Sequence, residues 1–281
     1  MKIGASTIAA MYVGGVPVSA AYLGGVQVFG GAAPFNPTQL FASGEQGAWY
    51  DPSDLSTMFT DTAGTTPAAV GDPVARINDK SGRGNHATQA TAAARPILRQ
   101  TAGGLYYLEF DGVDDTLATA TLPEPGVDKA QVFAGVRKLS DTGRNIVELS
   151  SGIGTNNGAI NLQANGLATR SRFVSKGTTA STADDLESIQ APTTLVLTGL
   201  GDISGGLATL RRDGTEVTQN TGTQGTGNYL AHPLFIGSRN QATFFFDGHI
   251  YSLIVRFGSN LDAATIEDVE GFVSDKTGVE I

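Results

Sequence analysis

Residues 233–256, PLFIGSRNQATFFFDGHIYSLIVR, contain the pattern that decides the fold. Two short apolar runs, 233–237 and 249–256, are separated by glycine and polar residues, as in β-strands joined by turns. The chain also has 37 glycines, which suit a fold with many turns. The sequence therefore predicts an all-β sandwich. Runs of the same kind recur at 105–110, 130–136, 145–149, 194–198 and 208–212.

One segment near the C-terminus departs from the strand pattern. Ile266, Val269 and Val273 recur at the spacing of one helix face. Asp262 is a suitable N-cap and Gly278 lies just beyond the last periodic residue. We expect a helix over 262–277 that packs on the sandwich.

The composition excludes several classes of function. The net charge is -9, and the 18 lysines and arginines are scattered, so a nucleic-acid surface is not expected. The absence of cysteine excludes disulfides and thiolate metal sites. No apolar run reaches the roughly 18 residues of a membrane span, so membrane insertion is not expected. The run 8–13 is too short for a signal-peptide core, which predicts synthesis in the cytoplasm without a signal peptide.

The first 35 residues contain a near-repeat, YVGGVPV at 12–18 and YLGGVQV at 22–28. Paired glycines between short apolar runs are typical of hairpin turns, so residues 1–35 are predicted to form a small β-meander. No charged side chain occurs from residue 3 to residue 44, so the meander edges lack the charges that usually prevent further pairing. We expect this segment to anchor the protein to a partner through Tyr12, Gly14, Gly15, Tyr22, Gly24 and Gly25.

Prolines at 34 and 37 indicate a linker, and the remaining chain, 36–281, is predicted to be one jelly-roll domain. Three short sequence motifs resemble those of a known family: DKSGRGNH at 79–86, FDGVDD at 110–115 and DGHIY at 247–251. With the closing helix, they resemble the laminin-G-like, concanavalin A-like jelly-roll domains of phage virion proteins. The repeat at the N-terminus resembles leaders of tail and head fibres in tailed phages and gene transfer agents. Ile77 departs from the family, where many relatives have tryptophan.

The resemblance implies a two-sheet antiparallel jelly roll that serves for display or for binding surface glycans. We therefore expect a non-enzymatic fibre or spike on the virion surface, attached to capsid or tail proteins through residues 1–35. The edges of the strands predicted in residues 1–35 carry no charge and would be covered by pairing with other copies of the chain. We therefore expect a homo-oligomer, specifically a trimer. Host surface polysaccharide is the expected ligand. A ligand-free capsid decoration protein is an alternative.

A second alternative is a polysaccharide depolymerase or glucanase that uses Glu109 and Asp111. These two carboxylates would share one strand face about 6–7 Å apart. Gly112 and the following aspartates instead favour a turn in which Asp111 accepts backbone amides. No cofactor is expected, although Asp111, Asp114 and Asp115 form a carboxylate cluster that could bind calcium.

Glycans are bound by planar amides, arginines and exposed aromatic rings. The three phenylalanines at 244–246 cannot all face one way on a strand, so an exposed ring there is a candidate sugar platform. Asn156, Asn157 and Asn228 are further loop candidates. The predicted carbohydrate-binding residues are Arg144, Asn145, Arg170, Arg172, Tyr229, His232, Arg239 and Asn240.

Overall fold

The computed structural model describes residues 35–167 and 169–281, together with six short strands before residue 30. The chain divides into two compact units, Met1–Asn36 and Pro37–Ile281. Among the described residues of the first unit, the strands pair as three antiparallel hairpins. They are β1 (Lys2–Ile3) with β2 (Ser6–Thr7), β3 (Tyr12–Val13) with β4 (Val16–Pro17), and β5 (Ala21–Leu23) with β6 (Val26–Phe29).

The predicted anchoring residues lie in and between these strands. Tyr12 pairs with Pro17, and Tyr22 pairs with Gln27. The glycines of the two expected turns, Gly14, Gly15, Gly24 and Gly25, lie outside the described residues. The anchoring role stays a prediction.

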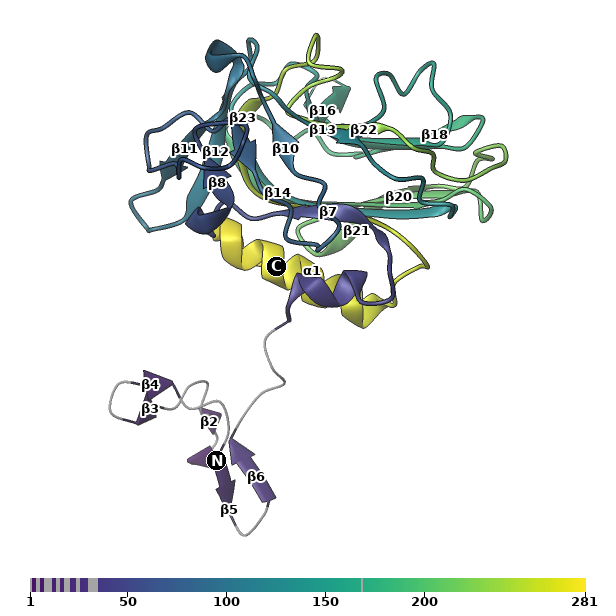
Figure 1. Cartoon of the computed structure of the whole chain (residues 1–281). Helices are drawn as coiled ribbons and strands as arrows, with labels where there is room; N and C mark the ends of the chain where they lie inside the picture. The colour runs from purple at the N-terminus through teal and green to yellow at the C-terminus, as the bar shows by residue number, and fades with distance from the viewer. Residues whose placement is uncertain are drawn as a thin grey trace. The chain divides into compact units, whose positions relative to one another are not determined.

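The second unit is a sandwich of two antiparallel sheets, which confirms the predicted jelly-roll class (Figure 1). The nine-stranded sheet has the order β18 (Ala180–Asp184), β17 (Arg170–Lys176), β16 (Ala159–Leu167), β15 (Asn145–Leu149), β22 (Pro233–Ile236), β13 (Leu117–Thr121), β10 (Ala87–Thr88), β9 (Arg76–Ile77) and β8 (Met58–Phe59). The eight-stranded sheet has the order β11 (Ile97–Gln100), β12 (Tyr106–Asp111), β23 (Asp247–Phe257), β14 (Lys129–Lys138), β19 (Thr193–Asp202), β20 (Leu207–Arg212) and β21 (Thr215–Asn220), with β7 (Gln46–Tyr50) also pairing with β23.

The core lies between the sheets, because alternate residues of each strand point inward. In β16, Ile160 and Leu162 belong to the core, as do Phe173 of β17 and Leu197 of β19. Three short 3-10 helices, η1 (Pro37–Phe41), η2 (Leu55–Thr57) and η3 (Ala92–Ala94), lie in the connections. In the described part of the chain, no helix is long and apolar enough to cross a membrane.

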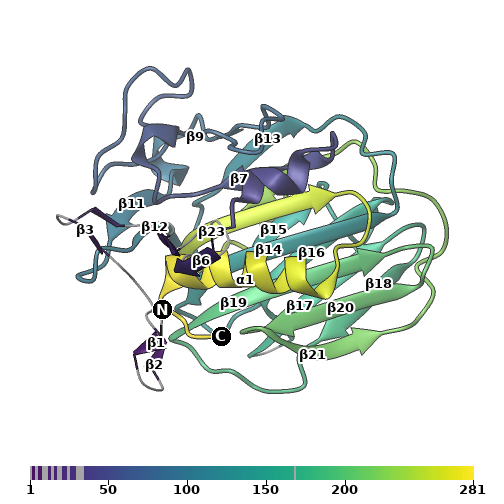
Figure 2. The same ribbon diagram turned by 90° about the horizontal axis from the view of Figure 1, so that it is seen from below.

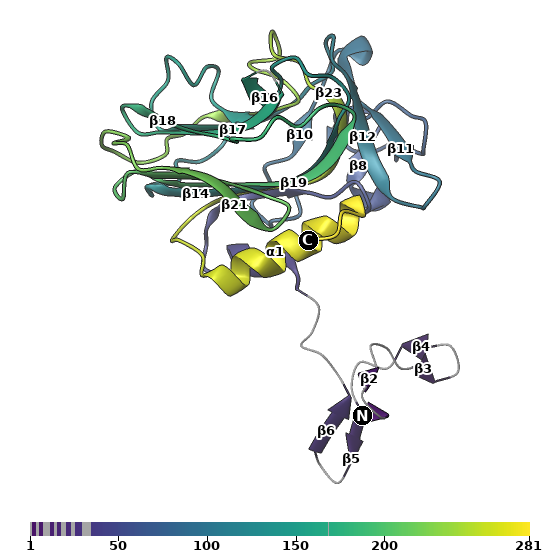
Figure 3. The same ribbon diagram turned by 180° about the vertical axis from the view of Figure 1, so that it is seen from behind.

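The predicted C-terminal helix is confirmed as α1 (Ala263–Thr277). The Asp262 carboxylate accepts a hydrogen bond from the Thr265 amide at 2.7 Å, and Gly278 ends the helix with a φ of 73°. The helix lies on the outer face of the eight-stranded sheet, across β14, β19 and β23 (Figure 2). Gly135 of β14 permits this close approach, because a Cβ there would lie 2.5 Å from Thr277 Cγ2. In Figure 3 the sheet of β16 and β17 lies on the opposite side of the sandwich from α1.

Candidate functional site

A buried carboxylate lies on the outer face of the nine-stranded sheet. Glu148 of β15 pairs with Asn161 on β16 and Phe235 on β22. The residues before and after each of these three in its strand belong to the core, so these three side chains point to the outer face. The Glu148 side chain is fully buried, and burial raises its pKa, an effect that the Arg239 charge opposes. Its Oε2 accepts hydrogen bonds from Arg239 Nε at 2.9 Å and Asn161 Nδ2 at 3.2 Å.

The same carboxylate also connects two neighbouring segments. Glu148 Oε2 accepts from Asn145 Nδ2, and Oε1 accepts from the backbone amide of Ile153 at 2.6 Å. Because one carboxylate satisfies donors from β15, from the loop after it and from Arg239, it holds these segments in one arrangement. Glu148 itself is too buried to touch a ligand, so it acts by positioning its neighbours.

Arg239 begins a tight turn that places side chains above this sheet. The Ala242 amide donates to the Arg239 carbonyl at 3.0 Å, and the Arg239 amide donates to the Thr243 carbonyl at 2.8 Å. Asn240 and Gln241 have φ values of 52° and 55°, the left-handed region that the two central residues of a type I′ turn require. Asparagine adopts this region readily, whereas glutamine does so rarely, so the conformation of Gln241 costs some energy.

Phe244 follows this turn and exposes its ring to solvent. Its side chain is 42% exposed, whereas Phe246 is fully buried. The guanidinium carbon of Arg239 lies 4.4 Å from the Phe244 ring centroid, so the cation stacks on the ring. The two terminal nitrogens of Arg239 donate no hydrogen bond to the described residues. The loop thus presents an exposed aromatic ring beside free guanidinium donors, and the sugar-platform role of this ring stays a prediction.

A row of polar side chains extends from this loop across three strands. Asn145, Gln163 and Arg172 are in register on β15, β16 and β17, and Arg172 faces Asp184 on β18. Gln163 Nε2 donates to Asn145 Oδ1 at 2.7 Å. Arg172 binds both carboxylate oxygens of Asp184, at 2.6 and 3.1 Å. The row provides amides and charges along one line of the sheet.

Two buried polar atoms near this row have no partner among the described residues, namely Asn161 Oδ1 and Arg144 Nε. Buried polar atoms are usually hydrogen-bonded, so each exception calls for an explanation such as a bound water or ligand. We define the platform surface as Arg144, Arg172, Arg239, Asn240 and Phe244, which the buried Gln163 supports from below.

The structure brings together part of the predicted carbohydrate-binding set. Arg144, Arg239 and Asn240 lie around the Phe244 loop, since the Asn145 amide donates to the Phe244 carbonyl at 3.0 Å. Arg172 lies in the polar row, and Arg170 lies at the start of the same strand. Asn145 requires a correction: it is fully buried and serves Glu148 and Gln163, so it supports the surface without reaching a ligand.

Tyr229, predicted to bind carbohydrate from a loop, also requires a correction. It is fully buried, and its hydroxyl lies 2.6 Å from Ser175 Oγ within the core. Its ring packs against Phe257. Polar loop neighbours suggested a surface residue, but a tyrosine whose hydroxyl finds an internal partner can fill a core position.

The remaining loop candidates lie near the start of strand β22, whereas the platform surface lies near its end. His232 precedes β22, whereas Arg239 follows it, and His232 Nε2 lies 2.9 Å from the Asn157 carbonyl oxygen. Asn228 Nδ2 donates to the Gly126 carbonyl. His232 and its neighbours Asn156, Asn157 and Asn228 therefore do not join the platform surface.

The carboxylates after β12 form the turn that the sequence predicts. Asp111 Oδ1 accepts from the Val113 amide at 2.8 Å and from the Asp114 amide at 3.2 Å. Glu109 is paired with Arg99 at 2.5 Å. Asp111 is thus engaged in the turn and Glu109 in an ion pair, and whether either acts in catalysis stays a matter for experiment.

Asp111, Asp114 and Asp115 offer carboxylate oxygens that lie within 4.8 Å of one another, which suits calcium by donor type. Burial, together with the charges of Asp111 and Asp114, raises the pKa of Asp115 to about 7. A divalent cation would relieve this repulsion. Calcium binding stays a prediction.

No protein-family model matches the chain, and the search of curated proteins finds no match. Among similar solved structures, domain 4 of AbnA, a GH43 extracellular arabinanase from Geobacillus stearothermophilus in complex with arabinotriose, has 17% identity and a TM-score of 0.53, covering 80% of this chain and 98% of that one. An arabinofuranosidase complexed with arabinofuranosyl-alpha-1,2-xylobiose has 14% identity and a TM-score of 0.56, covering 86% and 65%. The binding domain of botulinum neurotoxin DC in complex with SialylT has 12% identity and a TM-score of 0.51, covering 79% of this chain and 52% of that one.

The protein has a jelly-roll fold. At these identities the likeness shows the fold alone, and this chain spans about half of the toxin chain. The sequence missed Glu148 and Gln163 as parts of the site. A glutamate within the apolar run 145–149 was the available signal, because an unpaired charge is costly in a buried strand.

Proposed function

We propose that this protein binds glycans without cleaving them, and that the glycan lies on the platform surface. The observation that carries this proposal is the exposed Phe244 ring, stacked with Arg239 above a buried Glu148. An aromatic face covers the apolar side of a sugar, while arginine and amide groups bind its hydroxyls. Three similar folds were solved in complexes named for arabinotriose, arabinofuranosyl-xylobiose and SialylT, which supports a glycan as the ligand class.

The platform surface is held rigid before any ligand arrives. Arg239 is fixed through its Nε by Glu148, and Arg172 is fixed by two bonds to Asp184. Side chains that are already fixed lose little conformational entropy on binding. For long polar side chains such as arginine, this entropy is a main cost of binding a sugar.

A glycan array tests this proposal with the wild type, Phe244→Ala and Leu186→Ala. Leu186 is 72% exposed and lies outside the platform surface, so its variant is the matched control. We expect the wild type and Leu186→Ala to bind the same glycans, and Phe244→Ala to lose about tenfold or more in affinity, in line with the value of one stacked ring. Equal binding by Phe244→Ala, with a wild-type melting temperature, would contradict the proposal.

We further propose that the protein is a virion fibre or spike, with residues 1–35 as its anchor and a trimer as its assembly. The uncharged segment from residue 3 to residue 44 and the fibre-like leader support this. Deleting residues 1–35 should abolish incorporation into particles and reduce the trimer to monomers by light scattering, while the jelly roll stays folded. Incorporation of the truncated protein would refute the anchoring role.

The proposal that the protein is not an enzyme is tested directly with host capsule and β-glucan. We expect no new reducing ends after prolonged incubation, because Asp111 is engaged in a turn and Glu109 in an ion pair. Cleavage that disappears in Glu109→Gln would establish the depolymerase alternative instead.

A further inference from the structure

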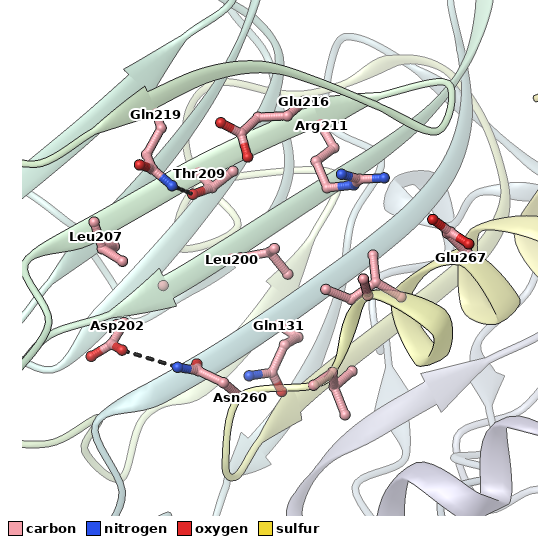
Figure 4. A pocket seen from close by; sticks show the side chains of 14 residues that line it. Gln131, Leu200, Asp202, Leu207, Thr209, Arg211, Glu216, Gln219, Asn260 and Glu267 are labelled. Carbon is pink, nitrogen blue, oxygen red and sulfur yellow. Dashed lines mark hydrogen bonds between the residues drawn. The ribbon is translucent and has the colours of Figure 1, made fainter.

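A separate cavity of about 290 Å³ lies on the opposite sheet, between the start of α1 and strands β19, β20 and β21 (Figure 4). Its apolar lining includes Leu200, Leu207 and Ile266. Figure 4 shows Leu200 in the middle of the view, with polar side chains around it. An apolar floor with a polar rim is the usual composition of a small-molecule site.

Two of the amides that line the cavity have groups free for a ligand. Gln219 Nε2 donates to Thr209 Oγ1 at 3.0 Å, which leaves Gln219 Oε1 as an acceptor. Asn260 Nδ2 donates to Asp202 Oδ2 at 3.1 Å, which leaves Asn260 Oδ1 as an acceptor. Each amide also keeps one N–H, so the cavity offers both acceptors and donors to the hydroxyls of a ligand.

The charge of the cavity is also unbalanced. Arg211, the basic residue that lines it, is held by Glu270 through bonds of 2.8 and 3.0 Å. Asp202 is paired with Lys129 at 3.0 Å. The carboxylates of Glu216 and Glu267 form no hydrogen bond or salt bridge with the described residues, and both line the cavity. Both carboxylates also attract the Arg211 guanidinium, but Glu270 already neutralises that charge, so the cavity keeps a net negative charge.

We propose that this cavity is a second ligand site that takes a sugar unit carrying a protonated amine. The sugar's apolar face lies on Leu200, its hydroxyls bind Gln219 and Asn260, and its ammonium is attracted by the carboxylates of Glu216 and Glu267 on the side away from Arg211. This site is independent of the platform surface, because it lies on the other sheet and beneath α1.

Methyl NMR spectra of the full chain test this proposal, with glucosamine, glucose and putrescine as probes. Glucosamine should shift the methyl signals of Leu200, Leu207 and Ile266, and glucose should bind more weakly because it lacks the amine. Putrescine should also bind more weakly, because it has no hydroxyls. Glu216→Gln and Glu267→Gln should each weaken glucosamine binding about two- to fivefold, the usual range for an exposed charge pair. Glu124→Gln, an exposed carboxylate outside the cavity, should not change it.

Three results would overturn the proposal: no shift of these methyl signals by glucosamine, equal binding of glucose and glucosamine, or tighter binding of putrescine than of glucosamine. Raised salt should weaken glucosamine binding more than glucose binding, because salt screens the charge contribution alone. These readouts are separate from the glycan array, since Phe244→Ala should leave the cavity unaffected.

Discussion

Replacing Glu148 with glutamine removes the charge that organises the platform surface while keeping the side-chain shape. The carboxylate accepts four hydrogen bonds, from Arg239, Asn145, Asn161 and the Ile153 amide. A glutamine must place its NH₂ group against one of these donors, so one bond is lost and one donor is left unpaired, at a cost of about 1–3 kcal/mol. The bond from Arg239 is kept but weakened, because its acceptor is no longer charged, and this brings the total cost to about 3 kcal/mol.

Thermal unfolding at pH 7.5 measures this effect. For a domain of this size, about 3 kcal/mol corresponds to a fall of about 6–12 °C in the melting temperature. Glu124→Gln, which is exposed, is the control and should change the melting temperature by less than about 1 °C. In an Arg239→Met background the cost of Glu148→Gln should fall by about half, because the charge-assisted bond is already absent. A Glu148→Gln protein as stable as the wild type would refute the reasoning.

Three further predictions concern the rest of the sandwich. Gly135→Ala should lower the unfolding free energy by about 1–3 kcal/mol, because its Cβ would press on Thr277, whereas Gly154→Ala, with open space around it, should be neutral in urea unfolding. Burial lowers the pKa of His249 to about 4, so the unfolded chain is protonated first and stability should fall as pH drops from about 6.5 to 4. His249→Gln should remove this pH dependence of the unfolding free energy, and an unchanged dependence in the variant would contradict the prediction. The pKa of Asp115 is raised to about 7, so its ionisation should lower stability as pH rises from 4 to 7. In EDTA, the stability of Asp115→Asn relative to the wild type should therefore increase across that range. Added calcium should reverse this difference if the cluster binds the ion.

The sequence predicted the elements whose signals are local. The run 145–149 is β15 at the same residues, and Asp262 and Gly278 bound α1 as expected. These predictions succeed because strand alternation, an N-cap and a left-handed C-terminal glycine each depend on a few adjacent residues.

The strands β16, β17 and β18 had no such signal. β16 alternates Ile160 and Leu162 with Asn161 and Gln163, and both sets are buried, because loops and neighbouring polar groups cover the outer face. Polar residues at this density are more typical of exposed strands or loops. Their burial depends on partners distant in sequence, such as Glu148 for Asn161.

The candidate site was predictable only in part for a similar reason. Arg239 and Asn240 were recognisable as loop residues able to bind glycans, but the turn that aims them has positive φ at Asn240 and Gln241, where glycine would be the usual signal. Tyr229 resembled its exposed neighbours in sequence, and only the packed structure shows that Ser175 and Phe257 surround it.

The location of a bound glycan tests the central claim most directly. The measurement is a crystal structure of the full chain with an oligosaccharide selected on the array. We predict that a sugar ring lies against Phe244, with its hydroxyls bonded to the terminal nitrogens of Arg239. A glycan found instead on the eight-stranded sheet, with the Phe244 ring bare, would contradict the account.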